Sequence, residues 1–559
     1  MYLVRILSAA RYFVLALFFQ QAFTSALSTK QQSLEELNPT FRTSKNILFA
    51  CTVGGSTHAN WVLAILNELE TRGHNVTFAT RDDHSRFGKK YGIDTISVGP
   101  PTVPKQHIIF EDNKHLDPNT VMGTLIGHIA DAYSSEYNAF KELIKTRQIN
   151  LVICDHFVDS CIEAARFHNL PFVITSTLAI APDARASFIG SGISLYGVHN
   201  NQLSLFERIH HNYLFTASFL WRNFNTLMNV AKIKKDLGIV ASADTMASWR
   251  NSLKLVNTAF GLENARPLGP LVEFIGPILP QHYQSLKNTP YETFLDRHNR
   301  VIYVAFGQNA IPSLLDRQLI WSSLLSLLDV GDIDGVIWAD GFADKVSQHS
   351  KYITLQQKEY TLLDIKSRSD VFISSWAPQM AILQHSSTAV FLTHGGAGSL
   401  YESLYAAVPM AVFPFVGDQL GAARNMEDQG LGVRLDRDDT VSNTAALLRT
   451  LVDNTQDNSN LGYKIRNNVK RYSALIQIHS QHAVQRGADL IEEVVFAGVS
   501  HRFEASRNMT FFKVYNLDIY LLFASIVMVC LWIGRWIIQQ LYRRMVQRSA
   551  GGNIKSKLQ

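Results

Sequence analysis

Two series of short apolar runs, each run followed by a segment of helix length, constrain the fold of this chain most strongly. The first series opens with NILFACTVGG, whose glycines end a continuous apolar run, and NWVLAILNELETRG follows with apolar residues at helical spacing. NVTFAT (75–80), LVICD (151–155) and PFVITST (171–177) continue the pattern of buried strands. Strand, helix and strand in this order form a parallel crossover unit.

The second series lies in the later half of the chain, with segments of helix length between most of its runs. Its members are VIYVAFG (301–307), GVIWAD (335–340), VFISSW (371–376), AVFLTHGG (389–396), PMAVFPF (409–415) and LGVRL (431–435). A chain of 559 residues also exceeds what one hydrophobic core usually organises. We therefore expect an α/β fold of two Rossmann-like domains, each a doubly wound parallel sheet, with ligands bound in the cleft at the carboxyl ends of the strands.

The domain boundaries follow from where these runs begin and end. We expect an N-terminal domain over residues 45–280 and a C-terminal domain over 301–475. The segment between them, 281–300, is polar and contains proline, which is typical of a linker. Residues 476–514 are expected to form helices that pack back against the globular part of the chain, followed by a segment that leads to the predicted transmembrane helix.

The first 26 residues have the layout of a secretory signal peptide. Arg5 and Arg11 precede an apolar run from Tyr12 to Phe19, and small residues lead up to Ala26, where we expect cleavage. A retained membrane anchor is the alternative, but the apolar run is shorter than the ~20 residues that a membrane span needs.

A second apolar stretch, near the C-terminus, predicts one transmembrane helix over residues 515–538. Its charged residues, Asp518 and Arg535, lie near its ends, and a buried core helix is the alternative. The tail over 539–559 carries five basic residues and no acidic one, which predicts a single-pass type I protein with a cytoplasmic tail and a luminal body. The ending KSKLQ resembles the dilysine signal that retrieves such proteins to the endoplasmic reticulum membrane.

The net charge and the cysteines of the chain indicate which partners, disulfides and metal sites to expect. The net charge of the chain is +5, and the tail alone accounts for it, so nothing suggests a nucleic-acid partner. The chain has four cysteines, Cys51, Cys154, Cys161 and Cys530. They do not make a disulfide framework, and we expect them to be small buried residues. No histidine or cysteine spacing suggests zinc, and two Asp-X-Asp spacings, at 332–334 and 436–438, fall in polar turns, so no metal site is expected.

The stretch FLTHGGAGSLYES joins the end of an apolar strand to a glycine-rich turn and the start of a helix. Backbone N–H groups at a helix start, reinforced by the helix dipole, favour a phosphate group. Glycines, Gly396 and Gly398 among them, let the backbone approach that phosphate closely. His394 and Ser399 can add hydrogen bonds. The turn is not a Walker loop, because no Gly-Lys-Ser or Gly-Lys-Thr follows it.

Groups suited to the rest of a nucleotide sugar surround this turn. Upstream, in SSWAPQ, Trp376 offers a flat face for a base and Gln379 offers an amide for its edge. One turn into the helix, Glu402 is an acceptor suited to ribose hydroxyls. Downstream, in PFVGDQ, Asp418 and Gln419 present groups that bind hydroxyls at the end of a strand.

This segment, WAPQ…THGGAGSLYE…VPM…DQ, closely resembles the donor-binding signature of the UDP-glycosyltransferases, an inverting family with two Rossmann-like domains in the GT-B arrangement. The resemblance extends through GGSTHANWVLAILNELETRGHNVTFAT and the membrane layout, roughly residues 45–540. It implies that the Trp and Gln of WAPQ contact the uracil and ribose, that the His-Gly turn binds the diphosphate, and that the Asp-Gln pair holds the sugar. It further implies a metal-independent hexosyltransferase that needs no cofactor, the UDP-sugar being a co-substrate.

The same resemblance implies a general base at His58 and an orienting acid at Asp155. His58 follows the first predicted strand and Asp155 ends a later one, so both are expected at the carboxyl edge of one sheet. A histidine with a carboxylate behind it can take the proton of an acceptor hydroxyl. The oxygen would then attack the anomeric carbon and expel UDP, inverting α to β.

The chain departs from the family pattern directly after VIYVAFG, where the family commonly has a serine. Here Gln308 and Asn309 follow Gly307. An amide can still donate to a phosphate or a base, so we expect altered donor contacts rather than lost activity. Gln419 favours UDP-glucose over UDP-glucuronic acid as the donor.

The acceptor is the least constrained part of the prediction. The aromatic-rich segment 203–229 lies where the resemblance places the acceptor pocket, and it could line a pocket for a lipophilic alcohol, lie on a membrane surface, or be an amphipathic core helix. Expected partners are a UDP-sugar donor, a lipophilic small-molecule or lipid acceptor and the membrane, with a homo-oligomer left open. Two other classes stay open: a non-catalytic sugar-nucleotide or lipid-binding membrane protein of the same fold, and a biosynthetic transferase acting on a membrane lipid or protein.

Overall fold

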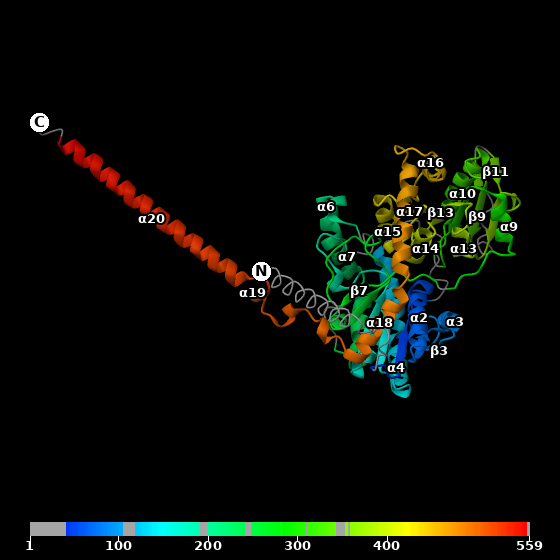
Figure 1. Ribbon diagram of the computed structural model, residues 1–559, viewed down its shortest axis with the longest axis horizontal. Coiled ribbons are helices and arrows are strands. Elements are labelled where there is room, and N and C mark those ends of the chain that lie inside the picture. The colour runs from blue at the N-terminus through cyan, green and yellow to red at the C-terminus, as the bar shows by residue number, and fades with distance from the viewer. Residues whose placement is uncertain are drawn as a thin grey trace, which may run out of the picture. The chain divides into compact units, whose positions relative to one another are not determined.

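The computed structural model describes residues 41–103, 118–190, 198–240, 247–280, 282–308, 310–341, 353–355 and 358–555. Residues 45–559 form one unit, which contains both sheets (Figure 1). The predicted signal peptide and the last four residues, with most of the dilysine ending, lie outside the described residues.

The first sheet has seven strands in the order β3-β2-β1-β4-β5-β6-β7, and all pairs are parallel. The strands are β1 (Asn46–Ala50), β2 (Asn75–Thr80), β3 (Asp94–Ser97), β4 (Leu151–Asp155), β5 (Phe172–Ser176), β6 (Leu253–Val256) and β7 (Val272–Phe274). The connecting helices include α2 (Ser56–Thr71), α3 (Ser85–Lys90), α4 (Pro118–Thr146) and α5 (Asp159–Phe167). The strand order reverses between β1 and β4, and such a switch point is where a doubly wound sheet binds ligands.

The second sheet repeats this arrangement with six parallel strands in the order β12-β9-β8-β13-β14-β15. The strands are β8 (Val301–Ala305), β9 (Gly335–Ala339), β12 (Val371–Ser374), β13 (Thr388–Thr393), β14 (Met410–Val412) and β15 (Gly432–Arg434). Its helices are α9 (Pro290–Arg297), α10 (Leu314–Asp329), α12 (Leu362–Lys366), α13 (Gln379–Leu383), α14 (Ala397–Tyr405), α15 (Asp418–Asp428) and α16 (Val441–Val452). An antiparallel pair, β10 (Ile353–Leu355) and β11 (Lys358–Tyr360), lies outside the sheet. The switch point is between β8 and β13, so the fold is α/β with two doubly wound parallel sheets, as predicted.

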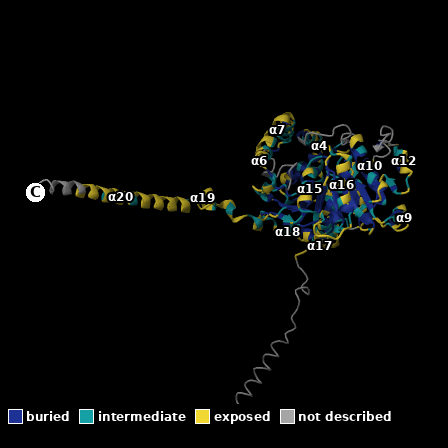
Figure 2. Cartoon of the chain, turned by 90° about the horizontal axis from the view of Figure 1, so that it is seen from above, coloured by how far each residue is buried: buried dark blue, intermediate teal, exposed yellow. Residues whose placement is uncertain are grey.

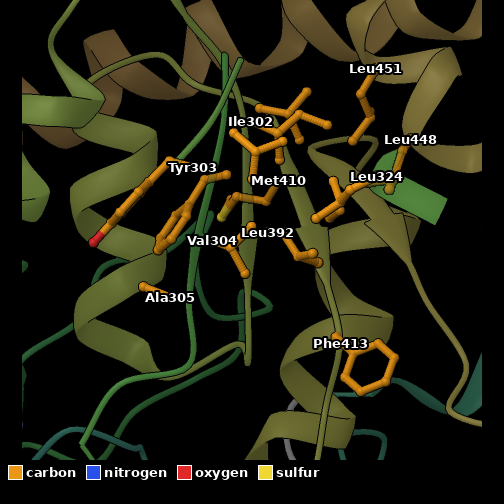
Figure 3. Packing of buried hydrophobic residues seen from close by; sticks show 14 of the residues in the cluster. Ile302, Tyr303, Val304, Ala305, Leu324, Leu392, Met410, Phe413, Leu448 and Leu451 are labelled. Carbon is orange, nitrogen blue, oxygen red and sulfur yellow. The ribbon is translucent and has the colours of Figure 1, made fainter. Parts of the chain in front are cut away.

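Both sheets are covered on their two faces, which explains the continuous apolar runs in the sequence. Along β1, Ile47 and Phe49 join one core cluster and Leu48 and Ala50 join another, as alternation in a strand requires. The second sheet packs in the same way against its helices, and Figure 3 shows Ile302 and Leu392 of its strands among the buried side chains of that core.

The last two helices of the globular part connect the two halves. Helix α17 (Leu461–Ser480) belongs to the core of the second domain, whereas α18 (Ala483–Ala497) contributes Leu490 and Ile491 to the core of the first. Residues 476–514 are the segment in which helices that pack back were expected. At the last residue of α17, Ser480 Oγ donates a hydrogen bond to the carbonyl oxygen of Pro277 at 2.8 Å. The second crossing of the chain between the halves therefore lies beside the first.

The expected linker over 281–300 is shorter than the sequence suggested. Thr289 Oγ1 accepts the backbone N–H of Glu292 at 3.3 Å, and Pro290 occupies the first turn of α9. Phe294 and Leu295 on this helix are buried in the core of the second domain. Because the segment is mostly polar in sequence, the two buried residues of α9 were not expected.

One helix among the described residues is long and apolar enough to span a membrane. This helix, α20 (Leu517–Lys555), contains a candidate span over Leu517–Arg548 whose most apolar 18-residue window has a mean hydropathy of 2.2. None of that window is buried, and Figure 2 colours the helix as exposed along most of its length. The alternative of a buried core helix is therefore wrong, and the helix continues past the predicted end at residue 538.

The prediction that the cysteines are unpaired was wrong for two of them. Cys154 in β4 and Cys161 in α5 form a disulfide, with their Cα atoms 5.9 Å apart. The chain turns sharply between the end of β4 and the start of α5, and this turn brings the two residues together. Cys51 is free and buried, and Cys530 is free and exposed within α20.

Candidate active site

His58 and Asp155 meet at the switch point of the first sheet. His58 lies in the first turn of α2, just after β1, and Asp155 is the last residue of the neighbouring strand β4. His58 Nδ1 lies 2.9 Å from Asp155 Oδ2. The Asp155 side chain is 1% exposed and that of His58 is 13% exposed, so the pair is shielded but the imidazole is still accessible. Asp155 Oδ1 accepts the backbone N–H of Phe157 at 3.0 Å, which fixes the carboxylate.

The electrostatics of the pair favour a base at His58. Burial lowers the pKa of His58, but the charge and hydrogen bond of Asp155 and the charge of Asp418 outweigh it, so this pKa lies above its ordinary value of 6.5. Burial raises the pKa of Asp155, but His58 and His156 hold it well below its usual range. Because a carboxylate can only accept, His58 Nδ1 carries the proton and Nε2 carries the lone pair that can act as a base.

His156 is a member of this site that sequence reasoning missed. Its ring stacks on that of His58 with the ring centroids 5.2 Å apart. Its Nδ1 lies 3.6 Å from Asp155 Oδ2, which is too far for a hydrogen bond, and no described residue is a hydrogen-bond partner of this atom. The ring of Phe157 also stacks on His58, at 5.4 Å. The signal in the sequence was the position of both rings directly after Asp155.

The glycine pair after β1 provides a test of how tightly the His58 ring is held. A Cβ atom on Gly54 (φ +93°) would overlap the His58 imidazole, whereas a Cβ on Gly55 (φ +71°) would meet no atom within 4 Å. We expect Gly54→Ala to lower kcat by roughly tenfold because it displaces the His58 imidazole. Gly55→Ala also places an alanine at positive φ but without the overlap, and it should leave kcat near that of the wild type. Measurement of kcat at saturating donor checks this, and equal effects of the two variants would contradict the placement of the ring.

The glycine-rich turn occupies the switch point of the second sheet. His394 follows β13, and Gly307 and Gln308 follow the neighbouring strand β8. The His394 ring lies between two glycines: a Cβ on Gly307 would be 2.9 Å from its Cε1, and one on Gly396 would be 2.5 Å from its Nε2. Both positions therefore need glycine for the ring to lie where it does. Gln308 is exposed, and Asn309 lies outside the described residues.

His394 and the start of α14 are suited to a diphosphate. Burial lowers the pKa of His394 to about 4, so its imidazole is neutral and has one N–H to donate. Its Nδ1 is buried and has no hydrogen-bond partner among the described residues, as expected of a group that meets a ligand. Gly396 precedes α14, and no side chain caps that helix, which leaves its first N–H groups available. Gly398 and Ser399 lie in this first turn.

Gln379, Ser399 and Glu402 form one hydrogen-bonded group next to the turn. Gln379 Nε2 donates to Glu402 Oε2 at 2.6 Å and to Ser399 Oγ at 3.3 Å. Burial raises the pKa of Glu402 to about 7, even though the bond from Gln379 opposes this shift. Trp376 is 57% exposed, while its carbonyl oxygen accepts hydrogen bonds from Ser374 Oγ and the Tyr291 hydroxyl. The backbone of Trp376 is thus fixed, and its ring remains accessible for stacking with a nucleobase.

Asp418 and Gln419 are the first two residues of α15, but their side chains lie in different surroundings. Burial raises the pKa of Asp418, and the nearby His58 and His156 oppose this shift. Gln419 Oε1 accepts the backbone N–H groups of Phe415 at 2.9 Å and Val416 at 3.2 Å. The oxygen of Gln419 therefore stabilises its own loop, and the NH₂ group is the part that can donate to a sugar.

The two domains bring these groups to facing walls. A Cβ on Gly398 would lie 3.7 Å from Thr57 Oγ1, one residue before His58. A cavity of about 50 Å³ between the domains is lined by Thr258 and Glu263 from one side and by Asp418 from the other. The cleft thus places the His58–Asp155 pair opposite the glycine-rich turn.

Two parallel-sheet domains that face a cleft define a GT-B glycosyltransferase fold, and solved structures agree. The glycotransferase of kitacinnamycin superposes with a TM-score of 0.56 over 81% of this chain and 99% of that chain, at 19% identity, which supports the fold alone. The model of the family described as UDP-glucoronosyl and UDP-glucosyl transferase matches residues 191–551. The chain belongs to the UDP-glycosyltransferase family, whose members take a UDP-sugar donor and an acceptor substrate.

Curated relatives from fungi align along most of the chain. A UDP-glycosyltransferase of Talaromyces amestolkiae is 29% identical over 529 residues, which cover 88% of this chain and 97% of the relative. The UDP-glycosyltransferase stmC of Aspergillus ustus is 27% identical over 534 residues, with the same shares covered. The similarity therefore includes both halves of the cleft.

Proposed function

We propose that this protein transfers a hexosyl group from a UDP-sugar to a hydroxyl of a lipophilic acceptor, with inversion and with His58 as the general base. The observation that carries the proposal is the 2.9 Å contact between His58 Nδ1 and Asp155 Oδ2 at a switch point that faces the glycine-rich turn. A binding protein without catalysis would have no need of this shielded pair. The non-catalytic alternative is therefore disfavoured.

The proposed reaction follows from the groups on the two walls of the cleft, the His58–Asp155 pair on one and the glycine-rich turn on the other. The acceptor O–H gives its proton to His58 Nε2, and Asp155 stabilises the imidazolium that forms. The acceptor oxygen bonds to the anomeric carbon while the bond from that carbon to the β-phosphate oxygen breaks, and UDP leaves with the electron pair. Attack from the face opposite the leaving group converts the α-linked sugar to a β-linked product. The start of α14 and a ring N–H of His394 stabilise the charge on the diphosphate without a metal.

UDP-glucose is the donor that the site supports best. Gln419 offers a neutral NH₂ group, and Asp418 beside it can accept hydrogen bonds from sugar hydroxyls. The carboxylate of UDP-glucuronic acid would meet the acidic Asp418, and none of the donor-site residues named above is a lysine or an arginine that could offset this repulsion.

The pH dependence of turnover tests the base. Since His58 must be neutral to accept a proton and its pKa lies above 6.5, kcat/KM should fall as the pH decreases through a value above 6.5. Asp155→Asn removes the charge that raises this pKa, so the acidic limb should move to lower pH and the maximal rate should also fall. Initial rates of UDP release from pH 5 to 9 measure both effects. An acidic limb that stays in place in the Asn variant would contradict the pairing.

The direct test is UDP release by the purified full chain in detergent. UDP-glucose and UDP-glucuronic acid are compared against a panel of hydroxylated lipophiles, with and without EDTA. We expect turnover with UDP-glucose that EDTA does not change. Preference for UDP-glucuronic acid would overturn the donor assignment. Loss of activity in EDTA would overturn metal independence, a relevant outcome because ligand atoms of His58, Asp155 and His156 lie within 4.8 Å of one another.

We also propose that the protein is a single-pass type I protein of the endoplasmic reticulum membrane, with the cleft in the lumen and the tail in the cytoplasm. Helix α20 supports an anchor, and the basic residues after it support the orientation. The Cys154–Cys161 disulfide supports a luminal cleft, because disulfides persist in oxidising compartments. In intact microsomes, protease should remove an epitope placed after residue 559 and spare the rest. Digestion of the catalytic part would overturn the orientation.

A further inference from the structure

The helices between β5 and β6 have an unusual distribution of side chains. They are α6 (Leu205–Ile209), the π-helical turn η7 (His210–Leu214), α7 (Phe215–Arg222) and α8 (Phe224–Asp236). None of the residues within these four elements is buried, and Figure 2 shows α6 and α7 largely in the colour of exposed residues. These helices therefore lie at the surface of the domain, where Ile233 of α8 packs against its core cluster from outside.

Part of the contact between these helices and α4 is polar. Asn223, between α7 and α8, is buried, and its Nδ2 donates to the carbonyl oxygen of Asn119 at 3.2 Å. Asn119 Nδ2 in turn donates to Ser218 Oγ at 3.4 Å. The amide of Asn223 lies so close to Gly123 of α4 that a Cβ there would overlap it. The half-buried side chains of these helices also include Phe215, Leu227 and Ile233, so the inward face combines this polar contact with apolar packing.

The outward face carries further large apolar side chains. Those more than 40% exposed are Leu205, Phe206, Ile209, Tyr213, Leu214, Leu220, Trp221, Phe224 and Met228. Trp221 is the most exposed of them, at 85%. From Ile209 to Ala231 the only lysine, arginine, aspartate or glutamate is Arg222. A monomer in water rarely exposes so many large apolar side chains within one short segment.

We propose that the outward face of α6, η7, α7 and α8 lies in the surface of the bilayer and forms a second membrane contact. The inference rests on the proposed anchoring by α20, because a chain tethered to a bilayer meets that surface at a high effective concentration. Tryptophan and tyrosine side chains are favoured at the level of the lipid headgroups. Exposed Arg222, Lys232 and Lys235 can extend to the headgroups while the apolar side chains enter the acyl region.

Site-directed spin labels test the surface in the full chain. Phe206→Cys and Trp221→Cys are made in a Cys530→Ser background and compared with Leu363→Cys, whose parent side chain on α12 is 76% exposed. Labelling should be specific, because Cys51 is buried and Cys154 and Cys161 are paired. In phosphatidylcholine vesicles, labels at 206 and 221 should collide more with oxygen than with a water-soluble nickel chelate. The label at 363 should show the reverse, and UDP binding by each variant confirms folding.

Each other outcome overturns the inference. Labels at 206 and 221 that collide with the nickel chelate as often as the label at 363 would show that this face lies in water. Low collision rates with both reagents would show that protein covers it. A label on native Cys530 separates this inference from the anchoring proposal. If that label reports lipid while 221 reports water, only the second contact fails; if it reports water, anchoring and inference fail together.

Discussion

His58→Ala is expected to lower kcat by ~10²- to 10⁴-fold while the affinity for UDP stays nearly unchanged. In the proposed mechanism, the variant removes the Nε2 lone pair that takes the acceptor proton, but it leaves the proposed diphosphate site intact. Rates of UDP release give kcat, and calorimetry gives the dissociation constant for UDP. Loss of UDP binding together with turnover would contradict a purely catalytic role for His58.

His156→Phe is the matched comparison for this prediction. Phenylalanine retains a ring against His58 and leaves the His58–Asp155 contact in place, since His156 Nδ1 is 3.6 Å from the carboxylate and makes no hydrogen bond to it. We therefore expect a much smaller loss of kcat than in His58→Ala. A loss as large as that of His58→Ala would show that the two imidazoles share the role of the base.

Gly395→Ala is expected to weaken UDP binding by roughly 10²-fold, because the loss of two charge-assisted hydrogen bonds would have an effect of this size. Gly395 has φ +87°, and a Cβ there would lie 2.8 Å from Val412 Cγ1, so the turn that presents the start of α14 must move. The strained backbone should also lower the free energy of unfolding by about 1–2 kcal/mol. Calorimetry with UDP and thermal unfolding measure the two effects.

Gly331→Ala separates the strain from the site. Gly331 has φ +76° and no atom within 4 Å of its Cβ position, and it lies in the turn after α10. This variant should lose a similar amount of stability and bind UDP like the wild type. If Gly395→Ala also binds UDP like the wild type, the turn after β13 does not hold the diphosphate.

Most of the fold was predictable because central parallel strands are covered on both faces and appear as continuous apolar runs. The strands that carry the site, β1, β4, β8 and β13, are of this kind. Strand β6 was missed because Lys254 interrupts its run. Burial lowers the pKa of Lys254, but the lysine is kept in the strand by an ion pair with Asp183 at 2.7 Å. Strands β3 and β7 were missed because they are short and partly polar.

Sequence reasoning named the residues of the candidate site other than His156 and Phe157, but it could not give most of their contacts. One segment of sequence carried the donor-site residues, and their assigned roles remain predictions. The hydrogen bonds that Gln419 Oε1 accepts from its own loop depend on how this loop folds back. No local sequence pattern predicts that conformation. Helical periodicity likewise predicts two faces for α6 to α8, but it does not predict whether each face contacts protein, water or lipid. The exposed fractions and the contacts with α4 show which side chains each face carries.

The hydrogen bond between Ser480 and Pro277 has a mechanical consequence. The chain crosses between the halves twice, and this bond ties the crossings together at one place. A rotation about this place would open the cleft without breaking the bond, whereas sliding of one half along the other would break it. Such a rotation needs changes of backbone torsion only near the crossings and leaves the core of each half intact. The hydrogen bond from Asn425 Nδ2 to the carbonyl oxygen of Leu262, at 2.9 Å, lies at the cleft and would break as the cleft opens.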